Sequence, residues 1–398
     1  MESVRVLHSV TKYLNLTENW IEPQVFRVPG ADGHVICDAR ANAAAFPVPP
    51  NALIVDPPVT EWHWRQRVWL ERRADRRGAN RAWSRWRARR WRPHLVHGHF
   101  GPRAWASRNL AARMGVPLVT SFYGYDAWMA PRIDPAWIDR YRELFAVGAL
   151  FLVEGPAMRD RLEALGCPPS KVRVHRIGVD LDGLTFRARA FAPVVTVAMV
   201  GRFVEKKGLV DGLRACAAAR VRGLDLRVTV VGDSSPDDSA GQSIAAALRA
   251  LAAGPELAGR VHFTGFISAD ETRSVLASHD VFLCPSRHAG DGDAEGGSPV
   301  ALTEAMAIGA YCIGTRHCDI PEVIVDGQTG AIREEGDVEG LVQALCDIPD
   351  NVPRVVQMTR EGRRHVEQRF AIERQLAGLG EVYRAVALGA APGGGARP

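Results

Sequence analysis

The sequence predicts an α/β protein with two domains, each built on a parallel β-sheet. Short apolar segments alternate with helical segments, and Gly and Pro punctuate the intervals, which is typical of βαβ units. The 398 residues suffice for two domains that each bury a core. Hydrophobic periodicity is lost over residues 180–193 and an apolar strand follows, so we expect the boundary between the domains there.

The first half is expected to hold six strands. They cover residues 4–10, 35–37, 52–56, 95–97, 118–122 and 150–154, and a helix is expected to begin near Thr17. No GxGxxG segment follows the first strand, so the pattern gives little support to a nicotinamide-dependent dehydrogenase.

The second half continues the alternation. Strands are expected over residues 194–200, 226–232, 260–265 and 280–285, and amphipathic helices over 354–369 and 371–386. The Gly- and Pro-rich end, residues 391–398, cannot pack a core and is expected to be a disordered tail.

The composition is that of a soluble globular protein, with 46% apolar and 24% charged residues. No signal peptide opens the sequence and no run of 18 apolar residues occurs, so we expect a cytoplasmic protein, with a peripheral position on the inner membrane face as an alternative. The seven cysteines are odd in number, scattered and without a CxxC pair, which favours reduced thiols over disulfides or zinc.

The loop after the strand at 280–285 has the features of an anion site. It leads into a helix through Gly296 and Gly297, with Ser298 as the expected N-cap and Pro299 at the first helical position. Glycines let a polyanion approach the backbone, and the helix start offers free N–H groups.

Glu295 and Glu304 bracket this turn. Because carboxylates repel anions, hydroxyl groups suit them better as partners, and an anion held beside hydroxyls is typical of a sugar nucleotide. Taken alone, an ordinary capped helix explains this stretch equally well.

A second loop, after the strand at 194–200, carries Arg202 and Lys207. The whole sequence has four lysines, at positions 12, 171, 206 and 207. Two adjacent lysines in an arginine-rich sequence suggest that a compact ammonium is required there. Ligands of open α/β sheets bind beyond the carboxyl ends of the strands, so both loops are expected to open onto one crevice.

Five segments resemble a known family in their order. They are HGHFG (97–101), SFYGYDA (121–127), GRFVEKKG (201–208), EGGSPVALTEAMA (295–307) and TRHCDIPEVI (315–324). Together they resemble the retaining GT-B glycosyltransferases of family four, in particular members that build polysaccharides such as colanic acid. The resemblance extends from about residue 4 to residue 383.

The resemblance implies the GT-B fold, in which two Rossmann-like domains with parallel sheets face a central crevice. Residues 1–185 would form the acceptor-side domain and residues 186–370 the donor-binding domain. Residues 371–390 would form a C-terminal helix that crosses back to the first domain.

The resemblance also implies transfer of a sugar, with retention, from a nucleoside-diphosphate sugar to a hydroxyl acceptor: a glycan, a lipid-linked sugar or a sugar-containing natural product. Arg202 and Lys207 would stabilise the leaving diphosphate, Glu304 would hold the ribose, and Glu295 a hydroxyl of the donor sugar. The other donor-side residues would be Gly201, Gly232, Phe266, Ile267, Gly296, Gly297, Ser298 and Pro299, with Phe266 and Ile267 against the base.

On the acceptor side, Tyr123, Gly124 and Asp126 follow one predicted strand and His99 follows another. Related enzymes often carry a histidine where Tyr123 stands, so a catalytic imidazole role would pass to His99; a structural histidine is the alternative. Asp126 is expected to bind acceptor or sugar hydroxyls.

Two features depart from the family pattern. The first loop, residues 9–20, lacks the family's glycines, and eight residues rather than the usual seven separate Glu295 from Glu304.

No metal and no cofactor beyond the nucleotide sugar are expected, with UDP as the favoured nucleotide. The acidic triplet Asp291-Gly292-Asp293 is interpreted as a hydrophilic turn. Two other functions remain open: a GT-B-like sugar-nucleotide epimerase or phosphorylase, and a non-catalytic sugar-nucleotide-binding subunit.

Residues 61–92 form an Arg- and Trp-rich segment with twelve arginines against three acidic residues. Arg with Trp at helical spacing suits an anionic membrane surface or an acidic acceptor, and a solvated helix pair is the equally weighted alternative. Nucleic acid fits less well, because no recognised binding module accompanies the charge.

Overall fold

The computed structural model describes residues 3–15, 18–49, 52–55, 90–191 and 193–389. The chain forms two compact units. The first comprises Met1–Val153, Arg159–His175 and Glu373–Pro398; the second comprises Glu154–Met158 and Arg176–Ile372. The Arg- and Trp-rich segment lies outside the described residues apart from residues 90–92, as does the predicted tail at 391–398.

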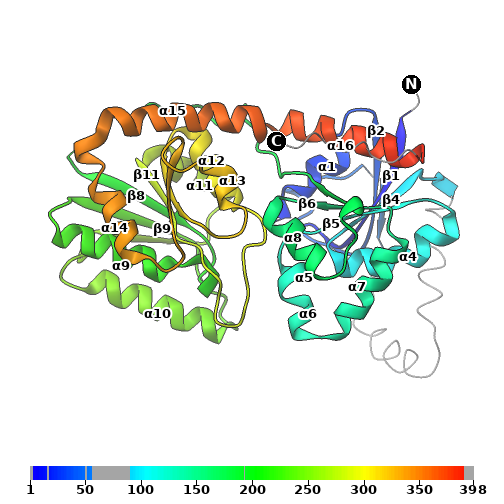
Figure 1. Ribbon diagram of the computed structural model, residues 1–398, viewed down its shortest axis with the longest axis horizontal. Helices are drawn as coiled ribbons and strands as arrows, with labels where there is room; N and C mark the ends of the chain where they lie inside the picture. The colour runs from blue at the N-terminus through cyan, green and yellow to red at the C-terminus, as the bar shows by residue number, and fades with distance from the viewer. Residues whose placement is uncertain (1–2, 16–17, 50–51, 56–89, 192, 390–398) are drawn as a thin grey trace. The chain divides into compact units, whose positions relative to one another are not determined.

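The first unit is a seven-stranded parallel sheet in the order β3-β2-β1-β4-β5-β6-β7 (Figure 1). Its strands are β1 (Val4–Tyr13), β2 (Ala31–Arg40), β3 (Leu53–Val55), β4 (Leu95–His99), β5 (Leu118–Ser121), β6 (Leu150–Val153) and β7 (Val172–Val174). Its helices are α1 (Ile21–Phe26), α4 (Gly101–Met114), α5 (Tyr125–Trp128), α6 (Ala130–Ile133), α7 (Ala136–Val147), η2 (Pro169–Lys171), most of α8 (Pro156–Ala164) and α16 (Ile372–Ala387).

The second unit is a six-stranded parallel sheet in the order β10-β9-β8-β11-β12-β13 (Figure 1). Its strands are β8 (Val195–Val200), β9 (Leu226–Val231), β10 (Val261–Gly265), β11 (Val281–Cys284), β12 (Tyr311–Thr315) and β13 (Gly330–Arg333). Its helical segments are η3 (Glu205–Lys207), α9 (Leu209–Val221), α10 (Ser239–Ala253), α11 (Ala269–Ser278), α12 (Val300–Ile308), α13 (Ile320–Val323), α14 (Val338–Cys346), η4 (Pro349–Asn351) and α15 (Val352–Arg369).

Both faces of the second sheet are buried, as the continuous apolar strands require. Along β11, Val281 and Leu283 join the core beneath α9 and α14, whereas Phe282 and Cys284 join the core beneath α11 and α12. Packing on both faces holds the strands of this sheet in place. Because the strands are parallel, the loops that follow them all leave from the same edge of the sheet.

These sheets confirm the predicted α/β class. All ten predicted strands are present, with ends that shift by a few residues. The structure adds β7, β12 and β13, which have three to five residues each. The helix expected near Thr17 begins at Ile21, and Thr17 itself lies outside the described residues.

The last helix, α16, belongs to the first unit, which confirms the predicted return of the C-terminal helix. The Tyr383 hydroxyl lies 2.7 Å from Nδ1 of His97, at the centre of the first sheet. Gly380 of this helix lies close to the segment that precedes β2, because a Cβ on Gly380 would lie 2.7 Å from the Pro29 carbonyl oxygen.

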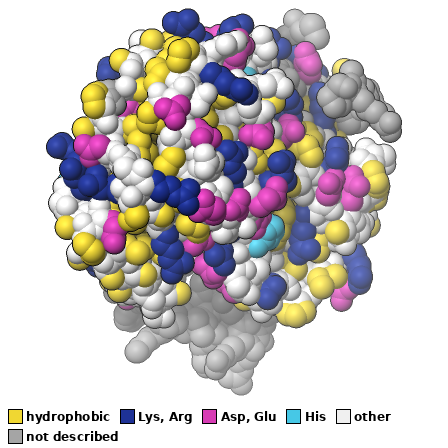
Figure 2. All heavy atoms as spheres, turned by 60° about the vertical axis from the view of Figure 1, so that its left-hand side comes forward, with side chains coloured by type: hydrophobic (Ala, Val, Ile, Leu, Met, Phe, Trp, Pro, Cys, Tyr) yellow, Lys and Arg dark blue, Asp and Glu magenta, His cyan; other side chains and the backbone are white. Residues whose placement is uncertain are grey.

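The surface mixes charges of both signs. Figure 2 shows Lys and Arg side chains interspersed with Asp and Glu over one face of the molecule. All seven cysteines are free thiols. Among the helices of the described residues, none has both the length and the apolar character needed to cross a bilayer.

Candidate functional site

The carboxyl ends of β8, β9 and β10 are tied together by backbone hydrogen bonds. The Gly201 amide donates to the Val231 carbonyl at 2.9 Å, and the Gly232 amide donates to the Gly265 carbonyl at 3.0 Å. Gly232 has a φ of +123°, and a Cβ there would lie 2.0 Å from the Gly201 carbonyl oxygen. This junction therefore requires glycine, because both the positive φ and the close approach exclude a side chain.

Lys207 crosses this junction and binds Glu295. A Cβ on Gly201 would lie 2.9 Å from Cδ of Lys207, so the absent side chain makes room for the lysine. The Lys207 Nζ atom lies 2.9 and 3.0 Å from the two carboxylate oxygens of Glu295, and the Ser286 hydroxyl donates to the same carboxylate at 2.8 Å. The structure thus joins the two loops that the sequence singled out.

The electrostatics of this pair favour two charged groups. Burial raises the pKa of Glu295, but Lys207, Lys206 and the Ser286 hydroxyl outweigh burial and hold the pKa below its usual value. Glu295 is therefore a carboxylate at neutral pH, and its side chain is only 8% exposed.

Lys206 has a different environment from its neighbour. Its Nζ atom lies 3.1 Å from Asp293 and donates to the Ala294 carbonyl at 3.0 Å, and the side chain is buried. This lysine holds the loop of residues 286–295, and Asp293 belongs to a turn in which Asp291 accepts a hydrogen bond from the Asp293 amide at 2.9 Å.

Arg202 has an exposed side chain. Within the described parts of the chain, its guanidinium forms no ion pair or hydrogen bond. Phe266, which follows β10, is 62% exposed, and Ile267 beside it is half-buried.

Glu304 projects from the second turn of α12 and binds an arginine that the sequence did not indicate. Nε and Nη2 of Arg273, on α11, lie 3.0 and 2.9 Å from Oε1 of Glu304. Burial raises the pKa of Glu304, and Arg273 opposes this effect only in part.

The start of α12 differs from the predicted cap. Pro299 has an extended ψ of 128° and occupies the N-cap position, so the helix begins at Val300 and Ser298 makes no capping hydrogen bond. Both glycines before it are buried, Gly296 with a φ of +87°. A Cβ on Gly297 would lie 1.9 Å from Oε2 of Glu154, so this glycine accommodates a carboxylate of the same unit.

His99, in the first unit, is the last residue of β4 and is fully buried. Its Nδ1 lies 2.8 Å from the Tyr123 hydroxyl, and its Nε2 lies 3.0 Å from Nδ1 of His8. Burial lowers the pKa of His99, and repulsion from His8 lowers it further, so the ring is neutral. Both ring nitrogens of His99 have protein partners and the ring is buried, which leaves no free nitrogen to contact a substrate. We propose instead that His99 orients Tyr123.

Asp126 is also buried, and two backbone amides occupy its carboxylate. The Gly101 amide donates to Oδ2 at 2.8 Å and the Tyr123 amide donates to Oδ1 at 3.0 Å. Gly124, with a φ of +112°, turns the chain into α5 between these contacts. We therefore propose that Asp126 holds the Tyr123 loop in place, rather than binding hydroxyls as expected from the sequence.

Two side-chain clusters in the described residues have nitrogen or sulfur atoms close enough to hold a metal ion: His8, His97 and His99, and His288, His317 and Cys318. In the first cluster, both ring nitrogens of His97 and of His99 already have hydrogen-bond partners.

Comparison with known proteins decides the family. Residues 29–182 match the profile described as Glycosyltransferase Family 4, and residues 194–351 match Glycosyl transferases group 1. The putative colanic acid biosynthesis glycosyltransferase WcaL of Salmonella typhimurium is 33% identical over 290 residues, which cover 71% of this chain and 68% of WcaL. The chain belongs to glycosyltransferase family four.

Other relatives and solved structures agree with this family. The amylovoran biosynthesis glycosyltransferase AmsK of Erwinia amylovora is 32% identical over 69% of this chain and 66% of AmsK. HepE of Anabaena, solved with UDP and glucose, superposes with a TM-score of 0.73 at 16% identity, covering 96% of this chain and all of HepE. Sucrose-phosphate synthase of Thermosynechococcus elongatus gives a TM-score of 0.72 at 18% identity, over 97% and 100% of the two chains. Both likenesses confirm the GT-B fold.

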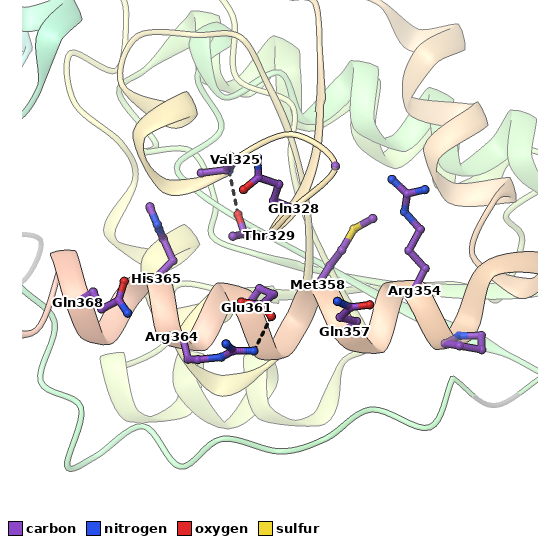
Figure 3. Close-up of a pocket in the computed structure, with 12 residues that line it drawn as sticks. Val325, Gln328, Thr329, Arg354, Gln357, Met358, Glu361, Arg364, His365 and Gln368 are labelled. Atoms are coloured by element: carbon purple, nitrogen blue, oxygen red, sulfur yellow. Dashed lines mark hydrogen bonds and ion pairs between the residues drawn. The ribbon is translucent and has the colours of Figure 1, made fainter. Parts of the chain in front are cut away.

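The family-four glycosyltransferase also has a pocket of about 810 Å³ along α15, lined by none of the predicted site residues (Figure 3). Its other wall is the segment 325–329, where the Val325 amide donates to the Thr329 hydroxyl at 2.8 Å. This segment precedes β13, so the pocket lies at the amino end of the sheet, whereas the candidate residues follow the carboxyl ends.

Four further residues that contact the candidate residues of the second unit, directly or through one another, escaped the sequence analysis: Arg273, Ser286, His317 and Glu335. Their partners lie 9 to 31 residues away in the sequence, and no spacing rule connects such pairs. Ser286 could have been found from the sequence, because it lies two residues after the end of β11, and the loops of the other candidates also follow strands.

Proposed function

We propose that this enzyme transfers a sugar from a nucleoside-diphosphate sugar to a hydroxyl acceptor with retention of the anomeric configuration. The observation that carries the proposal is the pairing of Lys207 with Glu295 over the glycine junction of β8 and β9. Ligands of open α/β sheets bind at such strand ends, so a cation at this junction supports the binding of a diphosphate.

The proposed chemistry follows from the leaving group. Breaking the anomeric bond leaves negative charge on the nucleoside diphosphate, so cations that meet this charge stabilise the transition state more than the ground state. Lys207 and Arg202 supply these cations in our proposal. Arg202 is suited to this task because its guanidinium is exposed and, within the described residues, engages no acidic partner.

The carboxylates would bind hydroxyl groups. Glu295 is ionised and held by Lys207, so we assign it to a hydroxyl of the donor sugar and to the placement of the lysine. Glu304 would accept hydrogen bonds from the ribose, because Arg273 fixes one of its oxygens and leaves Oε2 for a ligand. Phe266 and Ile267 would lie against the base.

The proposed donor nucleotide is UDP and the proposed acceptor a growing polysaccharide or lipid-linked sugar. HepE, which shares the fold, has been solved with UDP and glucose, and WcaL and AmsK are named for colanic acid and amylovoran biosynthesis. Charge on the diphosphate would be met by side chains, so we expect turnover to persist in EDTA.

A thermal-shift screen against UDP, GDP, ADP and TDP tests the donor proposal. A ligand that binds only the folded state raises Tm, by an amount that grows with its concentration relative to Kd. We expect UDP to give the largest shift, and the Lys207→Ala variant to reduce it. The absence of a shift with all four nucleotides would overturn the proposal.

Turnover assays separate the two other functions. Hydrolysis or isomerisation of the donor in the absence of an acceptor would favour an epimerase or phosphorylase. Binding without turnover on any polysaccharide-type acceptor would favour a non-catalytic sugar-nucleotide-binding subunit.

A further inference from the structure

His317 links two acidic residues of the second unit. The ring is fully buried between Glu335 and the backbone of Glu295. Its Nδ1 lies 2.6 Å from Oε1 of Glu335, and its Nε2 lies 3.1 Å from the amide nitrogen of Glu295. The Cys318 thiol lies 3.4 Å from the same Nε2.

The two neighbours determine the tautomer of His317. A carboxylate can only accept a hydrogen bond and a backbone amide can only donate one. His317 therefore donates through Nδ1–H to Glu335 and accepts through the lone pair of Nε2 from Glu295. Burial lowers the pKa of His317 against the opposing effect of Glu335, which is consistent with this neutral form.

Glu335 is itself fixed, so the ring cannot rotate freely. One of its oxygens accepts a hydrogen bond from the His288 amide at 2.8 Å, and Nδ1 of His288 lies 2.9 Å from the other. His288 lies near the start of the loop of residues 286–295, so Glu335 binds this loop near its start and His317 binds it at its end.

We infer that His317 is a positioning residue, which sets the place of the Glu295 backbone and thereby the Lys207–Glu295 pair. The inference rests on the proposed function for its effect on the donor, but its structural part stands alone. Without His317, the Glu295 amide would be a half-buried donor with no acceptor among the described residues, and the loop could shift the carboxylate away from Lys207.

Hydrogen exchange without nucleotide tests the structural part. His317→Leu removes both hydrogen bonds at similar volume, whereas His317→Gln keeps a polar group that can accept from the Glu295 amide. We expect exchange of the peptide containing Glu295 to rise about tenfold or more in His317→Leu and much less in His317→Gln. His279→Leu is the matched control, because His279 also bridges two partners, Val275 and Thr229, within the same unit.

A double-mutant cycle tests the functional part, with UDP and UDP-glucose as probes and calorimetry as the measurement. We expect His317→Leu to weaken UDP-glucose binding about tenfold in the wild-type background and less than about twofold in Glu295→Gln, because His317 acts through Glu295. EDTA is present throughout, since His317 and Cys318 with His288 have the spacing to capture a stray metal ion.

The outcomes are distinct. Wild-type exchange of the Glu295 peptide in His317→Leu, or an undiminished loss of affinity in the Glu295→Gln background, would overturn the positioning role. Failure of the wild-type enzyme to bind either probe would overturn the proposed function, and the exchange measurement would still decide the role of His317.

Discussion

Arg202 and Lys206 lie on the same loop in opposite environments, which gives a prediction at the scale of single residues. Arg202→Ala should lower kcat/KM about 10- to 100-fold with little change in Tm, because a charge-assisted hydrogen bond to the leaving group is worth about 1.5–3 kcal/mol. Lys206→Met should instead lower Tm, since it leaves Asp293 without its cation. Steady-state kinetics and thermal unfolding of both variants check this contrast, and wild-type turnover by Arg202→Ala would remove this arginine from the mechanism.

Arg273 should act on the donor through Glu304. Without Arg273 the pKa of Glu304 would rise further, so less of the ribose-binding carboxylate would be ionised as the pH falls. We expect Arg273→Met to weaken UDP binding about five- to tenfold near neutral pH, and by a larger factor at lower pH.

Titration calorimetry from pH 8 to pH 6 measures this effect. Arg273→Lys keeps the charge without the two-pronged geometry and should be intermediate. Glu304→Gln should abolish the difference in pH dependence between the two backgrounds. An equal loss of affinity at every pH in Arg273→Met would contradict the electrostatic explanation.

Asp319 should make stability depend on pH. Its Oδ1 accepts from the Ala157 amide at 2.8 Å, but Oδ2 is buried with no partner in the described structure. Burial raises the pKa of Asp319 to about 6. The charged form is thus disfavoured in the folded state, so the stability contributed by this group is present below about pH 4 and lost as the pH rises through about 6.

Asp319→Asn removes this titration. Relative to wild type, the free energy of unfolding of the variant should increase from pH 4 to pH 7 by up to about 3 kcal/mol. Urea unfolding at both pH values measures the difference. Asp139→Asn, at a side chain that is 78% exposed, should show none.

At the scale of elements, the turn from η3 into α9 depends on Gly208. Its φ is +60° and a Cβ there would lie 1.8 Å from the Pro285 carbonyl oxygen. Gly208→Ala should therefore cost about 3 kcal/mol or more, because strain and a backbone clash add. Gly259 has a φ of +69° with open space around it, so Gly259→Ala should cost only about 1 kcal/mol. Equal costs in urea unfolding would show that the clash relaxes freely.

Elements were predictable where the apolar pattern was long. β1, β8 and β9 have six to ten residues with buried side chains, and the sequence located each of them. β13 has only four residues, Gly-Ala-Ile-Arg, and its pairing with β12 stabilises it more than any local preference does. The cap of α12 was misplaced by one residue because a proline suits both the N-cap and the first helical position in φ, and only ψ separates them.

At the scale of the whole molecule, the Arg- and Trp-rich segment 61–92 remains a prediction from sequence. If it docks on anionic lipid, the protein should bind vesicles of phosphatidylglycerol at low ionic strength and release them as salt increases. Replacing the segment's six tryptophans by alanine should abolish binding. Cosedimentation measures both effects, and an absence of binding at low salt would favour a solvated segment or an acceptor surface.

The family and fold were predictable because ordered motifs mark the ends of successive strands, and parallel sheets place such ends along one edge. The polar contacts were not. Glu304 and Arg273 are 31 residues apart, and His97 and Tyr383 are 286 apart, so only the folded chain reveals that they meet. Asp126 shows the same limit. An aspartate beside a glycine turn looks the same in the sequence whether its carboxylate binds a sugar or two backbone amides.

The hydrogen bond between Tyr383 of α16 and His97 of β4 matters for expressing the two units as separate proteins. A fragment that stops at His175 would leave His97 without the Tyr383 hydroxyl and Pro29 without its close contact with Gly380. Such a fragment needs α16 supplied to it, joined through a spacer or added as a peptide, whereas of that helix the second unit contains only Ile372, whose amide donates to the Val179 carbonyl.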